Sequence, residues 1–215
     1  MYDLPYHKDN DETVLREFIR EHPFAFLIGC DATGSPVATQ VPVFLEERDG
    51  RQFLSGHLMK NTDHHKAFAA NQNVLVVFTS RHTYVSGSWY SDPHLPSTWN
   101  YMSLHARGPI RFLEGIALER ILRKTSLHFE GYDERSPTTF ENLPGALTQQ
   151  LVQAIAAFEI EVESIDSVFK LSQDRDAESY RTIIQRLKEK GEDGRFIAAE
   201  MEKRADRLFP GKKEN

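Results

Sequence analysis

Cysteine is almost absent from this sequence: Cys30 is the only one in 215 residues, so no disulfide can form within the chain. Long apolar runs are absent too, and none approaches the roughly 20 residues that a helix needs to cross a bilayer. Met1 is not followed by a basic segment and an apolar core, so we expect no secretory signal. We therefore expect a cytoplasmic protein in which Cys30 is a packed strand residue rather than a nucleophile.

Positive charge is also scarce, because 26 lysines and arginines are set against 32 acidic residues and the net charge is −6. DNA binding depends mainly on phosphate neutralisation by Lys and Arg, so this balance does not favour direct DNA contact. Near the end of the chain Lys203, Arg204 and Arg207 are interleaved with Glu202 and Asp206. We interpret these residues as a solvated helix face rather than a nucleic-acid patch.

The hydrophobic pattern of the first half predicts one helix followed by many short strands. Apolar residues recur at helical spacing over residues 14–19, and a His-Pro pair ends that helix. Because closure leaves no exposed edges, a small antiparallel barrel is the expected arrangement of the strands. The predicted strands cover residues 24–30, 37–45, 52–57, 74–79, a segment from 83, and 99–113, with a short helix over 64–70.

The second half of the sequence predicts mainly helices, around 118–125 and 147–158, and then a closing pair that meets at 191–194. One strand over 158–162 is expected to expose Glu159, Glu161 and Glu163 as a wet acidic face. Strands first and helices later indicate the α+β class. We expect a barrel domain with a helical insertion, residues 1–173, and a C-terminal helical appendage, residues 174–215.

Two segments are candidates for ligand contact. Pro42 lies inside a predicted strand although proline cannot donate a ladder hydrogen bond. It marks either an edge strand or a backbone left unpaired because a flat heterocycle lies against it. Residues 55–66 run from a strand end through a turn into a helix. With Lys60 and nearby histidines, this segment is either a capped polar turn or a phosphate site.

Both tryptophans, Trp89 and Trp99, flank a proline-containing loop over residues 91–97. Such a cluster is typical of a core or a dimer interface, and it also suits a stacked planar ligand. No nucleophile–base pair and no carboxylate pair can be identified, so the catalytic residues are unknown. His64 and His65 are adjacent and no third ligand lies at i+4, so we expect no metal site.

Together these segments resemble the PaiB family of FMN-binding negative transcriptional regulators, from Met1 to about residue 190. The resemblance implies a split β-barrel similar to those of pyridoxamine-phosphate oxidases and flavin reductases, with FMN contacted by both protomers of a homodimer. The motifs that carry it, in the same order and spacing, are Met1-Tyr2 with Pro5, Gln40-Val41-Pro42, Gly56-His57, Ser88-Trp89-Tyr90, Thr98-Trp99-Asn100-Tyr101 and Phe169-Lys170-Leu171-Ser172-Gln173.

The resemblance also implies which residues hold FMN. Some would contact the ring, others would contact the phosphate, and a third group would line the site from the other subunit. The family's turn reads Arg-Pro-Asn-Pro, but here residues 60–63 read Lys-Asn-Thr-Asp, so Asp63 brings a negative charge towards a dianionic phosphate. The implied residues are Thr39, Gln40, Val41 and Pro42 for the ring; Ser55, His57, Lys60, Thr62 and His64 for the phosphate; and Trp89, Trp99, Asn100 and Tyr101 for the lining.

The resemblance implies a negative regulator that uses FMN as a ligand or a redox sensor. The alternative is an FMN-dependent oxidoreductase acting on a small substrate, in which the flavin carries the chemistry. A haem-binding split barrel is a third candidate, for which the sequence offers nine histidines and singles out none. Whether the protein is an enzyme is open from the sequence.

Overall fold

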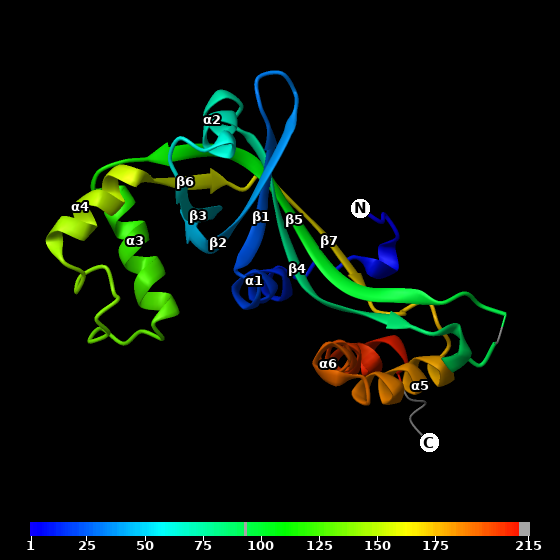
Figure 1. Ribbon diagram of the computed structural model, residues 1–215. Coiled ribbons are helices and arrows are strands. Elements are labelled where there is room, and N and C mark those ends of the chain that lie inside the picture. Colours follow the sequence, from blue (N-terminus) through cyan, green and yellow to red (C-terminus); the bar gives the residue numbers. More distant parts are fainter. Residues whose placement is uncertain (93, 211–215) are drawn as a thin grey trace. The chain divides into compact units, whose positions relative to one another are not determined.

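The computed structural model describes residues 1–92 and 94–210, and the chain divides into two compact units (Figure 1). The barrel unit comprises residues 16–78 and 105–165. The terminal unit comprises residues 1–15 and 79–104 and the described chain from residue 166 onward. Several elements, including two long strands, begin in one unit and end in the other, so the units are not consecutive stretches of sequence.

Seven strands form one sheet in the order β4-β1-β2-β3-β6-β5-β7, and β4 also pairs with β5. The first six strands of this order therefore form a closed ring, and the fold is the α+β split barrel that the sequence predicts. The strands are β1 (Phe24–Cys30), β2 (Pro36–Arg48), β3 (Arg51–Met59), β4 (Asn73–Val85), β5 (Thr98–Leu113), β6 (Ile155–Glu161) and β7 (Ser164–Lys170).

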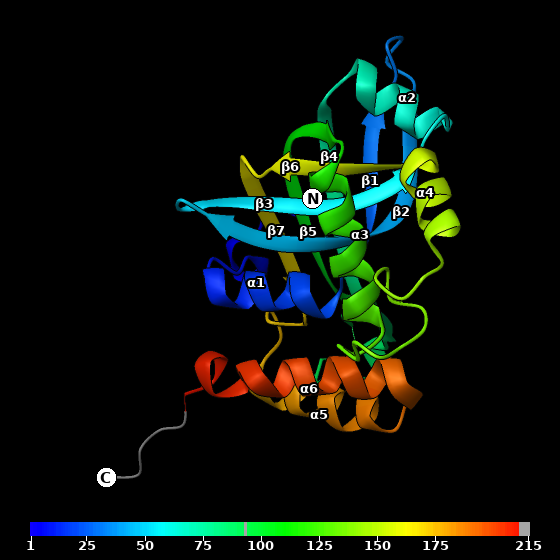
Figure 2. The same ribbon diagram turned by 90° about the vertical axis from the view of Figure 1, so that its left-hand side faces the viewer.

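Six α-helices accompany the strands, and among the described residues none is long and apolar enough to cross a bilayer. In the terminal unit α5 and α6 pack side by side (Figure 2), where the Tyr180 hydroxyl donates to the carbonyl oxygen of Met201 at 2.9 Å. The helices are α1 (Glu12–Glu21), α2 (Asp63–Ala70), α3 (Ile116–Phe129), α4 (Gly145–Ala154), α5 (Ala177–Lys188) and α6 (Gly191–Leu208), with 3-10 turns η1 (Pro5–His7) and η2 (Gly87–Trp89).

Two predictions about charged residues were wrong. Glu159 does not belong to a wet acidic face: it is 1% exposed, and its carboxylate pairs with Arg48 and Arg111. Arg204 is also buried rather than solvated, because its Nη1 donates to the Glu200 carboxylate at 2.7 Å and to the Glu200 carbonyl oxygen at 2.8 Å. In both cases an ion pair makes burial tolerable: the partners of Glu159 lie on other strands, whereas the partner of Arg204 lies one turn earlier on α6.

The chain also differs from the predicted elements where apolar spacing was ambiguous. One strand, β4, covers the segment in which two strands were predicted. The predicted helix over 147–158 ends at residue 154, and β6 begins at the next residue. The predicted domain boundary at residue 173 stays a prediction, and residues 211–215 of the predicted appendage lie outside the described residues.

The close approach of β5 and β6 gives a test of this packing. A Cβ atom added to Gly108 lies 1.8 Å from the carbonyl oxygen of Glu161, so Gly108→Ala forces two backbones apart and is expected to destabilise the fold by at least about 2 kcal/mol. Gly145→Ala is the matched control, because its Cβ meets no atom within 4 Å. Urea unfolding measures both, and equal midpoints would contradict this packing.

Candidate functional site

Strand β2 exchanges its partner at Pro42. Residues 36–42 pair with β1, ending at the pair of Pro42 with Phe24, whereas residues 43–48 pair with β3, beginning at the pair of Val43 with Gly56. Proline lacks an amide hydrogen, so it is suited to a position where a strand stops pairing on one side. Within the described chain, no strand pairs with the second edge of residues 39–42.

The open edge of β2 carries the four residues expected to contact a flat ring. Gln40 is exposed, Thr39 and Pro42 are half-buried, and Val41 is buried. On its other edge, this part of β2 pairs with β1 over seven consecutive residues, which fixes the position of its backbone. The edge is thus a rigid row of backbone and side-chain hydrogen-bonding groups.

His57 lies on β3 just beyond the last pair with β2, opposite Ala157 of β6. Its Nδ1 atom is buried and has no hydrogen-bond partner among the described residues. Burial lowers the pKa of His57, which keeps the imidazole neutral near pH 7. An unpaired buried polar atom costs about 1–3 kcal/mol, so a ligand group that bonds to Nδ1 is favoured here.

The turn between β3 and α2 is capped from within. Thr62 is the N-cap of α2: its Oγ1 accepts from the amide of His65 at 3.3 Å and donates to the carbonyl oxygen of Met59 at 3.0 Å. The Asp63 carboxylate accepts from the amide of His64 at 2.7 Å and lies 3.0 Å from the His64 ring. These bonds lower the pKa of Asp63, whose carboxylate takes the position that an anion would occupy at a helix N-terminus.

Two further phosphate candidates lie close to this turn. The amide of Lys60 donates to the carbonyl oxygen of Ala154 at 2.8 Å, and no ion pair engages its ammonium group within the described chain. Ser55 is buried on β3, with its hydroxyl 3.4 Å from the Glu46 carboxylate. Lys60 is therefore the available cation of the turn, whereas Ser55 already faces an acidic group.

The four expected lining residues, including Trp89 on η2, belong to the terminal unit. Trp99 is 53% exposed, whereas the next residue of β5, Asn100, is fully buried. The Asn100 amide accepts from the Ser172 hydroxyl at 3.0 Å and lies 3.5 Å from the sulfur of Met201. Adjacent strand residues point to opposite faces, so Trp99 and the half-buried Tyr101 share a face that Asn100 does not.

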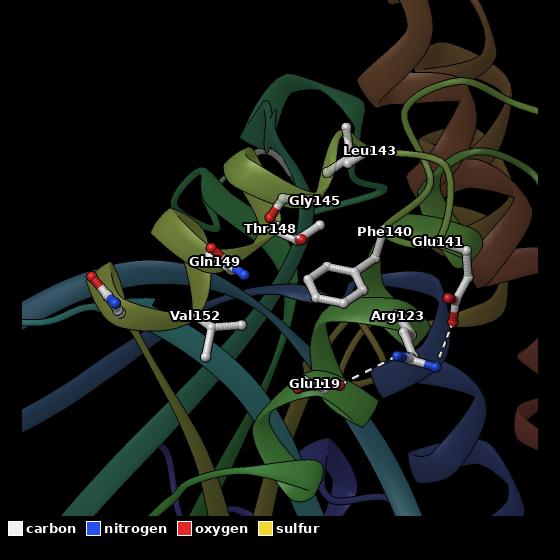
Figure 3. Close-up of a pocket in the computed structure, with 10 residues that line it drawn as sticks. Glu119, Arg123, Phe140, Glu141, Leu143, Gly145, Thr148, Gln149 and Val152 are labelled. Atoms are coloured by element: carbon white, nitrogen blue, oxygen red, sulfur yellow. Dashed lines mark hydrogen bonds and ion pairs between the residues drawn. The ribbon is translucent and has the colours of Figure 1, made fainter.

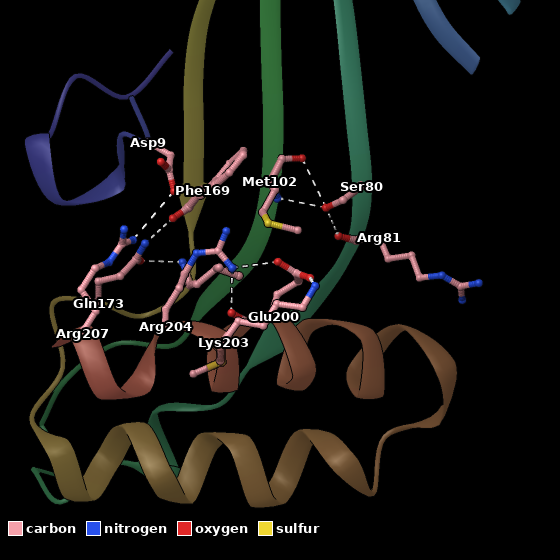
Figure 4. Close-up of polar contacts among 12 residues, drawn as sticks. Asp9, Ser80, Arg81, Met102, Phe169, Gln173, Glu200, Lys203, Arg204 and Arg207 are labelled. Atoms are coloured by element: carbon pink, nitrogen blue, oxygen red, sulfur yellow. Dashed lines mark hydrogen bonds and ion pairs between the residues drawn. The ribbon is translucent and has the colours of Figure 1, made fainter. Parts of the chain in front are cut away.

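The motif over residues 170–173 supports the Trp99 segment from inside the terminal unit. The Lys170 ammonium donates to the Thr98 hydroxyl and, at 3.0 Å, to the carbonyl oxygen of Trp99. The Gln173 amide bonds to the carbonyl oxygen of Phe169 (Figure 4), while its oxygen accepts from the amide of Leu171 at 2.7 Å. This motif therefore fixes the backbone on which the Trp-Asn-Tyr motif is built.

Sequence reasoning missed two aromatic neighbours of Trp99. The ring centroids of His82 and Tyr84 lie 5.7 and 5.9 Å from that of Trp99. Their period-two spacing could have placed His82 and Tyr84 on one face of a strand. The prediction instead ended one strand at residue 79 and began another at residue 83, whereas β4 continues through both residues.

A cavity of about 470 Å³ lies between α3, α4 and the connecting loop of the barrel unit (Figure 3). The Phe140 ring faces it, and Arg123 is held by Glu119 at 3.2 Å and by Glu141 at 2.6 Å. Arg123 is the one cation among the described lining residues and is already paired twice, and no pattern in the sequence indicated this cavity. Residues 1–92 and 94–210 hold no cluster of three or more His, Cys, Asp or Glu side chains arranged for a metal ion.

Comparison with known proteins identifies relatives of this chain. A family model described as a "Putative FMN-binding domain" matches residues 1–164. The chain is 30% identical to "Protease synthase and sporulation protein PAI 2" of Bacillus subtilis (strain 168) over 189 residues, covering 87% of this chain and 89% of the relative.

Solved structures show the same fold at low sequence identity. The flavocytochrome Anf3 of Azotobacter vinelandii superimposes with a TM-score of 0.56 at 15% identity, covering 79% of this chain and 72% of that protein. The FAD and heme binding protein of Mycobacterium smegmatis gives a TM-score of 0.54 at 16% identity, covering 76% and 73%. These similarities concern the fold alone.

The buried His57 predicts a pH dependence of stability. Its folded-state pKa lies below the ordinary value of 6.5, so the unfolded chain takes up the proton first as the pH falls. The contribution of the neutral His57 to the free energy of unfolding is complete above about pH 6.5. It is lost as the pH falls below this value, at up to about 1.4 kcal/mol per pH unit. We expect His57→Gln to lose less stability than the wild type between pH 7.5 and 5.5 in urea titrations. The exposed His94, as His94→Gln, is the control, and equal pH slopes for wild type and His57→Gln would contradict the prediction.

Proposed function

Because the chain belongs to the PaiB-like family of FMN-binding domains, we propose that it binds FMN between the open edge of β2 and the turn before α2. The observation that carries this proposal is the unpaired Nδ1 of His57, buried where β3 parts from β2. An isoalloxazine ring is flat and has hydrogen-bonding atoms along its rim, and the edge formed by residues 39–42 offers backbone and Gln40 groups of the matching kind.

In this proposal the open edge of β2 meets the ring as it stands, whereas the phosphate end requires a rearrangement. The Asp63 carboxylate occupies the helix N-terminus and repels a dianionic phosphate. Asp63 is exposed, so its side chain can rotate away. Lys60, with Thr62 and His64 beside it, then supplies the charge and the hydrogen bonds, and Ser55 lies on the strand that leads to them.

We further propose that the functional form is a homodimer. On β1 the buried Ala25 and Leu27 alternate with Phe24 and Phe26, which are 59% and 39% exposed. Phe24 pairs with Pro42 and Phe26 with Gln40, so this apolar face adjoins the proposed ring site. A second copy that covers it would exclude water from the flavin. In this proposal Trp89, Trp99 and Tyr101 line the site from the partner subunit, and the buried Asn100 anchors the strand segment that carries Trp99 and Tyr101.

Bound FMN supplies one- and two-electron transfer. The chain's own residues orient the ring, with the neutral His57 bonding at its rim and Lys60 holding the phosphate. The family relationship supports negative transcriptional regulation as the biological role.

One observation favours the second candidate, an FMN-dependent oxidoreductase. Two of the lysines that α5 and α6 offer are engaged in ion pairs: Lys188 with Glu202 at 2.6 Å, and Lys203 with Glu200 at 2.5 Å. Each such pair lowers the positive charge that is available to the phosphates of DNA. Titration with promoter DNA at several salt concentrations, beside an assay of flavin reduction by a soluble hydride donor, separates the two roles.

Substitutions in the turn test the cofactor assignment. Lys60→Gln is expected to weaken FMN binding about tenfold through loss of a charge-assisted bond, and Asp63→Asn to strengthen it several-fold through loss of repulsion. Flavin fluorescence titration measures both. Lys66→Gln is the matched control, because Lys66 is an exposed lysine on α2, directly after the turn.

Riboflavin, which has no phosphate, provides the second control for these variants. Its affinity should not change in Lys60→Gln or Asp63→Asn. An equal loss for riboflavin and FMN in Lys60→Gln would refute the phosphate assignment, and a wild-type protein that binds neither compound would refute the proposed function.

The apolar face of β1 tests the homodimer. Phe24→Glu places a charge on the exposed face, so we expect a dimeric wild type to become monomeric in sedimentation velocity. Ile116→Glu is the control, because Ile116 is 88% exposed at the start of α3. A monomeric wild type, or a Phe24→Glu variant that stays dimeric, would exclude this interface.

A further inference from the structure

Three rings gather on one exposed face of β4 and β5 within the terminal unit, and we call them the aromatic face: His82, Tyr84 and Trp99. The Trp99 ring contacts both of the others. Tyr84 is 41% and Trp99 53% exposed, and His82 is exposed as well. A cluster of exposed large rings marks an interaction surface, whereas a single exposed apolar residue does not.

The opposite face of the same strands is buried, which fixes the orientation of the aromatic face. Thr83, Val85 and Met102 are at most 8% exposed, and Asn100 is bonded to Ser172. The Ser80 hydroxyl also accepts from the amide of Met102 at 3.2 Å (Figure 4). The rings are therefore presented by strands that cannot rotate without opening a core.

Two lysines place positive charge beside these rings. The Lys190 ammonium lies 5.5 Å from the centroid of Tyr84 and 4.9 Å from that of Trp89, and it forms no ion pair within the described chain. The nearby carboxylates of Glu192 and Asp193 are engaged by Arg81 at 3.1 and 3.0 Å.

Lys170 adds a second charge on the Trp99 side, where its ammonium binds the Trp99 carbonyl oxygen. The aromatic face is thus bordered by two lysines, and the two acids that follow Lys190 in α6, Glu192 and Asp193, share the guanidinium of Arg81.

We propose that the aromatic face binds a planar heteroaromatic anion. The rings stack on the planar group, and Lys190 attracts the negative charge. This binding does not depend on flavin, so it can be tested apart from the proposed function. A long polyanion such as single-stranded nucleic acid is not expected, because the net charge of the chain is −6.

Calorimetric titration of the full chain with adenosine 5′-monophosphate, adenosine and ribose 5-phosphate tests this inference. We expect the first two to bind and ribose 5-phosphate, which has no ring system, to bind far more weakly. Tyr84→Leu and Trp99→Leu should each weaken both ring ligands about tenfold. Lys190→Gln should weaken the monophosphate about threefold and leave adenosine unchanged. Lys188→Gln, whose lysine contacts Glu202 instead, is the matched control.

Affinities that stay unchanged in both Tyr84→Leu and Trp99→Leu would overturn the inference, provided that circular dichroism shows folded variants. Tighter, steeply salt-dependent binding of a single-stranded oligonucleotide would also overturn it. Parallel FMN titrations separate this result from the proposed function. Monophosphate binding that depends on Tyr84, in a protein that takes up no FMN, supports the binding surface and refutes the flavin site.

Discussion

Pro42 has no amide hydrogen, and β2 passes from β1 to β3 at this residue. A strand that pairs on both sides along its whole length would leave no open edge. Because the exchange occurs in mid-strand, residues 39–42 pair with β1 on one side and with no strand of the described chain on the other. His57 lies just beyond the last pair of β3 with β2, and its Nδ1 has no hydrogen-bond partner among the described residues. The candidate site is thus a by-product of how the barrel divides its strand pairing.

The barrel could be predicted from the sequence because its strands are short, alternate with period two and end at turn residues. Which of the charged residues are buried could not be predicted from the sequence. Glu159 has the same alternating context as Glu161, yet only Glu159 is buried between two arginines from β2 and β5. Partners that lie 48 and 111 residues away leave no trace in a local pattern.

The candidate site shows the same division between local and distant information. Pro42 and the turn before α2 were identified because proline and helix caps have local signatures. The internal capping by Asp63 could be suspected from its charge, but its bond to the His64 amide is a matter of geometry. The aromatic neighbours of Trp99 were missed because contacts across strands depend on register, which sequence spacing alone does not fix.

The terminal unit draws its residues from three distant segments of the chain, and this affects how the protein is made. His7 contacts Gln173, Lys8 contacts Asp166 at 2.5 Å, and Asp9 lies 3.8 Å from Arg207. Residues 7–9 are therefore synthesised at least 158 residues before these side chains. Until residues 166 onward are synthesised, the segments of β4 and β5 that belong to the terminal unit lack the other part of that unit. A nascent chain that stops before residue 166 therefore leaves His7, Lys8 and Asp9 without these contacts, and one that stops before α6 still lacks the contact of Asp9 with Arg207.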